Sequence, residues 1–269
     1  MRRWVWRPSM ATAFRTGLPW GRRTLRTDAW WVEPTVVLVV LLAFVVYATF
    51  RVFENAHYSA GVFHTPFGSP DLRGYVPFLS ALPFAVSPAM VILPFPAGFR
   101  LTCYYYRKAY YRSFGRRPPG CAVEGATKPD YWGERKGPFI LQNLHRYFLY
   151  AALVVLVFNI YDMIGAFGVW EGHLYVGLGS FLFVLNVALL SGYTLGCHSL
   201  RHLVGGKLDM FSCDTLARSR YGLWAKVTWL NGRHMTWAWA SLITVALTDL
   251  FVRGVSAGWW RDVVLLGGL

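Results

Sequence analysis

The chain has 269 residues, of which 55% are hydrophobic and only 15% are charged, whereas a soluble domain carries about 25% charged residues. This deficit, and the grouping of the apolar residues in long runs, indicates an integral membrane protein. The net charge of +14 would suggest a nucleic-acid ligand in a soluble protein, but here basic segments alternate with apolar runs, so we expect no nucleic-acid partner.

The first 34 residues form a basic segment that contains seven arginines and two acidic residues. A short apolar core with a small-residue cleavage site does not follow at once, so the segment differs from a secretory signal peptide. Its richness in arginine leaves a transit peptide as the alternative. We expect residues 1–34 to form a basic cytoplasmic N-terminal segment.

Five apolar stretches follow and predict an all-α membrane domain of five transmembrane helices over residues 35–253. They lie at about 34–50, 73–100, 139–167, 174–202 and 229–251. The second stretch contains five prolines, and we expect a kinked or broken helix there, with neighbouring helices satisfying the freed carbonyl groups. Residues 254–269 are predicted to form a short external tail at the membrane interface.

The basic residues also predict the orientation. Segments 1–34, 100–138 and 201–233 carry seven, nine and six Lys/Arg, whereas segments 51–76, 162–173 and 249–269 carry two, none and two. Because basic loops remain in the cytoplasm, this alternation places the N-terminus inside and the C-terminus outside a plasma membrane.

With this orientation, all four cysteines and four of the seven histidines fall at the cytoplasmic side, and helices two to five each bring one there. We expect these four helices to form a bundle around this layer. Thiolate and imidazole together select zinc, copper or an iron–sulfur centre, and two of each suit either a Rieske-type [2Fe–2S] cluster or structural zinc. The alternative to a metal site is that the cysteines are ordinary buried side chains and the histidines are polar residues at the membrane interface. The candidate metal ligands are Cys103, Cys121, Cys197, His145, His198, His202 and His234.

The spacing does not choose among these candidates, since the chain has no CxxC and no HExxH motif. Cys103 stands at a predicted helix end, and Cys121 can fold back toward it because a Pro-Pro-Gly turn precedes it. Cys197 is the alternative second thiol. Cys213 is set aside because it lies in a polar loop.

Several long motifs resemble those of a known family: FRLTCYYYRKAYYRSF, PPGCAVE, ILQNLHRYFLYAAL, GCHSLRHLVGGKL and NGRHMTWAWASLITVALTDLFVR. They are similar to the membrane-anchor subunit of the actinobacterial type of succinate dehydrogenase, over most of residues 15–253. The resemblance implies a five-helix anchor for a flavoprotein subunit and an iron–sulfur subunit. It also implies a Rieske-type [2Fe–2S] centre that passes electrons to menaquinone or ubiquinone, with no catalysis by this chain alone.

Residues of the layer that do not bind the cluster are expected to line a quinone site, and Arg146, Tyr147 and Trp237 are the predicted quinone-binding residues. A haem b anchor of the same complex is the alternative, although the external histidines lie in loops or at a helix edge. A transporter would need a charge or a broken-helix site near the membrane midplane, and only the proline-rich stretch supports a transporter. An unrelated metalloenzyme would need carboxylates in the layer, where Glu is scarce.

Overall fold

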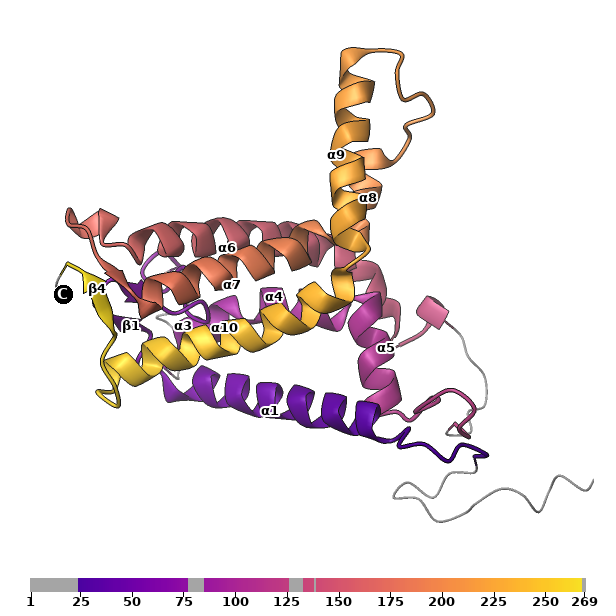
Figure 1. Cartoon of the computed structure of the whole chain (residues 1–269), viewed down its shortest axis with the longest axis horizontal. Helices are drawn as coiled ribbons and strands as arrows, with labels where there is room; N and C mark the ends of the chain where they lie inside the picture. The colour runs from indigo at the N-terminus through magenta and orange to yellow at the C-terminus, as the bar shows by residue number, and fades with distance from the viewer. Residues whose placement is uncertain (1–23, 77–84, 126–132, 138, 268–269) are drawn as a thin grey trace, which may run out of the picture.

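The computed structural model describes residues 24–76, 85–125, 133–137 and 139–267, and these are mostly helical (Figure 1). Two small antiparallel sheets pair β1 (Ser59–Ala60) with β2 (Phe63–His64) and β3 (Val176–Gly177) with β4 (Val264–Leu266). Three short 3-10 helices span Gly133–Arg135, Phe139–Leu144 and Val169–Glu171. The α-helices are α1 (Val32–Glu54), α3 (Pro88–Ile92), α4 (Pro94–Leu101), α5 (Tyr104–Ser113), α6 (His145–Gly165), α7 (Leu178–Leu195), α8 (His198–Gly205), α9 (Thr215–Asn231) and α10 (His234–Ser256).

Four helices in the described part of the chain are long and apolar enough to cross a membrane, namely α1, α6 with the 3-10 helix before it, α7 and α10. They run lengthwise beside one another in Figure 1, and α7 packs against both α6 and α10. Apolar side chains such as Val39 and Val46 of α1 and Val157 of α6 are more than half exposed. Because such surface is stable in hydrocarbon but not in water, the chain is a multi-pass membrane protein.

The proline-rich second stretch is broken, as its sequence predicts. Its described helical residues form α3 and α4, which are separated at Leu93 because Pro94 and Pro96 cannot donate the hydrogen bonds that would continue α3. Neither helix is long enough to cross a membrane. The start of the predicted stretch, residues 77–84, lies outside the described residues, as do residues 1–23 of the basic N-terminal segment.

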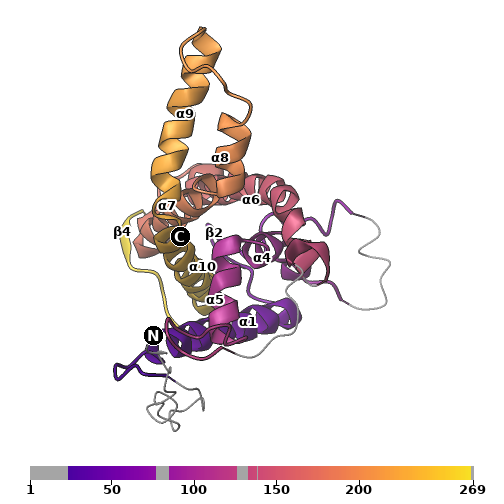
Figure 2. The same cartoon turned by 90° about the vertical axis from the view of Figure 1, so that its right-hand side faces the viewer.

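Three further helices, α5, α8 and α9, run across the direction of the long helices at one end of them (Figures 1 and 2). We call this the cysteine–histidine end; α4 and α7 finish here, and α6 and α10 begin here. The prediction that the fourth span continues to His202 was wrong, because α7 ends at Leu195. The prediction that the fifth span begins at Trp229 was also wrong, because α10 begins at His234. The tyrosine-rich run after Cys103 also turns away as α5 instead of extending the second span.

Local geometry explains these turns. Cys103 and Cys197 both have extended backbone angles, φ/ψ −67/128° and −66/138°, which break the helix before each of them. Gly196 makes the second break possible, because a Cβ atom there would lie 2.6 Å from the carbonyl oxygen of Gly192 and 3.2 Å from the backbone of Leu230. The chain therefore turns out of α4 and out of α7 at a cysteine.

The opposite end of the long helices is held by buried charges. Arg51 of α1 is 0% exposed, and its Nε donates to Asp249 Oδ2 of α10 at 2.8 Å. Arg51 also pairs with Glu54, which binds Arg253 of α10 at 2.7 Å, so two cations face two anions. The hydroxyl of Thr65 donates to the other oxygen of Asp249. These contacts fix α1 to α10 and leave no net charge in the cluster.

Candidate functional site

Two cysteines and two histidines meet at the cysteine–histidine end. Cys103 is the residue before α5 and Cys197 is the residue before α8, so each thiol stands where the chain turns out of a preceding helix, α4 or α7. His145 is the first residue of α6 and His234 is the first residue of α10. The chain therefore leaves α4 and α7 at a cysteine, and α6 and α10 begin at a histidine of the same layer.

The four side chains form two cysteine–histidine pairs. Cys103 Sγ lies 3.6 Å from His234 Nε2, and Cys197 Sγ lies 3.2 Å from His145 Nε2. The pairs join residues 131 and 52 positions apart in the chain. Cys103, Cys197 and His145 are buried and His234 is half-buried. Burial raises the pKa of the Cys197 thiol to about 11, so a bound metal ion would have to displace its proton.

The imidazoles are oriented by neighbouring side chains. Thr102 Oγ1 lies 2.9 Å from His145 Nδ1, which leaves Nε2 for the thiol of Cys197. Phe99 stacks on His145 with a centroid separation of 4.8 Å, and Tyr193 stacks on His234 at 4.9 Å. Nδ1 of His234 is buried and has no hydrogen-bond partner among the described residues. The layer thus holds two thiols and two imidazoles with little freedom to reorient.

The other predicted ligands lie apart from these pairs. Cys121 is exposed, and its backbone carbonyl accepts a hydrogen bond from Arg26. His198 and His202 are exposed on α8, where His202 Nδ1 lies 3.3 Å from a guanidinium nitrogen of Arg146. Among the residues that the structure describes, no three His, Cys, Asp or Glu side chains gather around one point. The donors therefore form two pairs and not one closed cluster.

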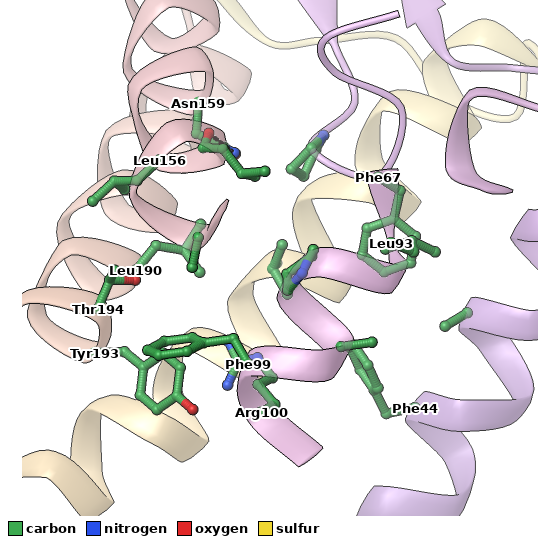
Figure 3. Close-up of a pocket in the computed structure, with 17 residues that line it drawn as sticks. Phe44, Phe67, Leu93, Phe99, Arg100, Leu156, Asn159, Leu190, Tyr193 and Thr194 are labelled. Atoms are coloured by element: carbon green, nitrogen blue, oxygen red, sulfur yellow. Dashed lines mark hydrogen bonds between the residues drawn. The ribbon is translucent and has the colours of Figure 1, made fainter. Parts of the chain in front are cut away.

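A mostly apolar cavity of about 100 Å³ lies beside the aromatic rings that stack on the two histidines (Figure 3). Phe44 of α1, Phe67 of the loop after β2, and Leu156 and Leu190 of the long helices contribute to its wall. Phe99 and Tyr193 also line it, with ring centroids 5.3 Å apart. Because these two rings stack on His145 and His234, one aromatic layer separates the cavity from the imidazoles.

Arg100 supplies a positive charge to this cavity. Its guanidinium lies 4.5 Å from the centre of the Tyr193 ring and donates to Tyr106 Oη at 2.6 Å, to the carbonyl of Ala238 at 3.1 Å and to Ser241 Oγ at 2.9 Å. All three acceptors are neutral, and within the described chain no carboxylate forms an ion pair with Arg100. Its charge therefore remains available to an electron-rich ligand. In the sequence, Arg100 is only one of the nine basic residues of segment 100–138.

The three predicted quinone-binding residues do not line this cavity. Tyr147 is 68% exposed on α6, and Arg146 is exposed beside His202. Trp237 is half-buried against Gly192 of α7, with its indole nitrogen buried and without a partner in the part of the chain that is described. The residues that line the cavity were missed because Phe99, Tyr193 and Asn159 look like ordinary residues of apolar spans.

The chain is similar to a known protein family and to a chain of a solved complex. The family model described as actinobacterial succinate dehydrogenase subunit SdhC matches residues 32–258. A chain of the solved Mycobacterium smegmatis Sdh1 complex in the apo form is 43% identical, with 91% of this chain and 94% of that chain covered and a TM-score of 0.78. No curated protein matches the sequence.

Proposed function

Because the chain belongs to the actinobacterial SdhC family, and is thus a non-catalytic subunit of a succinate dehydrogenase complex, we propose that it passes electrons to a membrane quinone through a Rieske-type [2Fe–2S] centre. The observation that carries this proposal is the meeting of Cys103 with His234 and of Cys197 with His145. A Rieske-type centre requires two thiolates and two imidazoles, and the two pairs supply this set.

The donor set fits a two-iron centre. Two thiols and two imidazoles are the ligand set of a Rieske-type centre, in which the thiolates bind one iron and the imidazoles bind the other, so each cysteine–histidine pair would supply one ligand to each iron. Thr102 contacts Nδ1 of His145, and imidazoles that bind a metal usually have such a hydrogen-bond partner on their other ring nitrogen. Nδ1 of His234 is buried without a hydrogen-bond partner among the described residues, which suits a side chain that binds a ligand. When bound, such a centre accepts and releases one electron at a time.

The adjoining cavity is the proposed site of the quinone, either menaquinone or ubiquinone. Its apolar wall suits the ring and the start of an isoprenoid tail. The guanidinium of Arg100 lies at its edge and would stabilise the negative charge that develops on a quinone oxygen during reduction. Phe99 and Tyr193 would hold the quinone one aromatic layer away from the histidines.

Haem b is the alternative cofactor and has less support. A haem between the spans would need an imidazole that faces its iron. The residues described around the cavity include no histidine. At the opposite end, His57 is bound to Ser256 by a 3.2 Å hydrogen bond, and His64 and His173 are exposed.

The cysteine–histidine end is proposed to face the cytoplasm and to receive the flavoprotein and iron–sulfur subunits. The alternation of Lys/Arg between the two sides supports this orientation. The stretch that contains α3 and α4 would provide a fifth crossing and would put the two termini on opposite sides. A reporter fused after Leu269 tests this, since a cytoplasmic reporter would contradict it.

The test of the cofactor uses the complete complex with its partner subunits. We expect His145→Ala and His234→Ala to remove the rhombic low-g electron paramagnetic resonance signal and succinate-driven quinone reduction together. Reduction of a soluble dye by succinate should persist, because it does not need this subunit. His202→Ala is the matched control, since His202 is exposed outside the pairs, and should retain the signal. Retention of the signal in all three variants would refute the proposed ligands.

A further inference from the structure

Two carboxyl groups are buried among the described residues, and their surroundings differ. Asp249 is bonded to Arg51 and to the hydroxyl of Thr65, so its charge and both of its oxygens are satisfied. Asp162, near the end of α6, is 6% exposed, and its Oδ2 has no hydrogen-bond partner in the described part of the chain. Ionisable side chains inside a membrane domain are costly and often serve as proton relays. Asp249 therefore has a structural role, whereas the contacts of Asp162 leave an oxygen for proton exchange.

Asp162 lies between the cavity and the end of the protein opposite the cysteine–histidine end. Asn159, one helical turn before it on α6, lines the cavity and is 5% exposed. Figure 3 shows Asn159 at the other end of the cavity from Arg100. Ser69, in the buried loop after β2, contacts Asp162, and the exposed His64 of β2 is close enough to interact with its charge. The carboxyl group thus has an exposed residue near it and a residue of the cavity wall one turn away.

An unpartnered amide of α7 belongs to the same region. Asn186 is 1% exposed, and neither its Oδ1 nor its Nδ2 has a hydrogen-bond partner among the residues described. It stands one turn before Leu190, a residue of the cavity wall, and therefore on the same face of α7. Because Ser180 donates to the carbonyl of Ala166, the antiparallel packing of α6 and α7 puts Asn186 at about the depth of Asn159. Internal water molecules usually bind buried polar groups of this kind.

We propose that Asp162 relays protons to the quinone from the end of the protein that carries β2, through water molecules bound by Asn159 and Asn186. The inference rests on the proposed function, because the cavity must hold the quinone. A quinone becomes a quinol by taking up two electrons, which come from the iron–sulfur centre, and two protons. The carboxyl group of Asp162 releases a proton, which water carries to a quinone oxygen, and the resulting carboxylate takes a proton from water near His64. Two such cycles supply both protons.

The cavity wall does not supply a better donor. Arg100 keeps its proton, because a guanidinium is not deprotonated in proteins. The hydroxyl of Tyr193 is buried, and the described residues give it no hydrogen-bond partner from which it could regain a proton. At the cysteine–histidine end, the rings of Phe99 and Tyr193 separate the cavity from the two histidines. The polar residues that continue away from the cavity are those around Asp162.

The first test uses the complete complex with decylubiquinone, a short-chain ubiquinone analogue. Asp162→Asn keeps the size of the side chain and removes its proton exchange, so we expect it to lower succinate-driven quinone reduction by about 100-fold. The electron paramagnetic resonance signal and the reduction of a soluble dye should be retained. Glu171→Gln is the matched control, because it removes an exposed carboxylate from the same end of the protein, and it should leave the rate unchanged.

Chemical rescue separates a proton relay from a structural role. Azide is a small weak base whose acid form carries protons, and it should raise the rate of Asp162→Asn several-fold. The rate of Arg100→Gln should not respond to azide, since that variant lacks a positive charge and keeps its proton donor. A normal rate in Asp162→Asn, or a slow rate that azide does not raise, would overturn the proposal.

The side from which the protons come is measured with the unaltered complex in phosphatidylcholine vesicles that enclose a pH indicator. Succinate does not cross the bilayer, so only complexes whose soluble subunits face outward turn over. We expect the interior to become alkaline while decylubiquinone is reduced, and a protonophore to abolish this change. Quinone reduction at constant interior pH, with the iron–sulfur signal present, would overturn the inference alone. Absence of that signal from the unaltered complex would refute the proposed function, and the inference with it.

Discussion

The buried pair of Arg51 and Asp249 allows a quantitative prediction. In Arg51→Leu, Asp249 would keep only the hydroxyl groups of Tyr47 and Thr65 as donors, while Glu54 would keep Arg253. A buried carboxylate that loses its cation costs about 3–5 kcal/mol of folding free energy. For a chain of this size, about 2–4 °C of melting temperature is lost per kcal/mol, so Arg51→Leu should lower the Tm by about 10 °C.

The assay is thermal unfolding of the purified complex, followed by tryptophan fluorescence. Adding Asp249→Leu to Arg51→Leu should restore part of the lost Tm, because both charges are then absent. Arg73→Leu is the control: Arg73 pairs with Asp71 at 2.6 Å but both side chains are more than 40% exposed, so the change should cost at most about 1 kcal/mol. If Arg51→Leu were no more destabilising than Arg73→Leu, or the double variant were the least stable, the reasoning would be wrong.

Three further changes test the site and the turn. Arg100→Gln should preserve the iron–sulfur signal and lower the rate of quinone reduction by about 100-fold, since it removes the charge beside the cavity; an unchanged rate would exclude this role. Thr102→Val should weaken iron retention by about 10- to 100-fold, because Nδ1 of His145 loses its contact with the Thr102 hydroxyl. Thr102→Ser keeps the hydroxyl and should restore iron retention, as iron analysis of the purified complex would show. Gly196→Ala should destabilise the complex by about 1–3 kcal/mol, whereas Gly222→Ala, whose Cβ meets nothing within 4 Å, should not; equal Tm values for the two variants would contradict the tight turn.

The class of the protein, and the layer in which the paired cysteines and histidines lie, could be predicted from the sequence. Uninterrupted apolar runs identify the first and third spans directly, because length and hydropathy alone decide whether a helix can cross a membrane. The distribution of Lys/Arg over the loops then predicted that all four cysteines and four of the histidines lie at one side of the membrane. All four paired residues, Cys103, Cys197, His145 and His234, belong to the predicted ligand set.

The sequence could not show which four of the seven candidate ligands meet in pairs. Whether His198 or His145 meets Cys197 depends on where α7 ends, and an unbroken helix to His202 fits the hydropathy equally well. The break depends on the close approach of the Leu230 backbone to Gly196, which is a contact between α9 and the end of α7. Hydropathy responds to the residues of one segment and carries no information about such a contact.

Only the tertiary structure shows the different roles of Arg100 and Arg51. Arg100 and Arg51 each look like a basic residue at the end of an apolar run, and both were counted as topology signals. In the folded chain, Arg100 is held by neutral acceptors from α5 and α10 beside a cavity, whereas Arg51 is neutralised by Asp249 and Glu54. The electrostatic role of a charge depends on the partners within a few ångströms of it, and these come from helices far apart in the sequence.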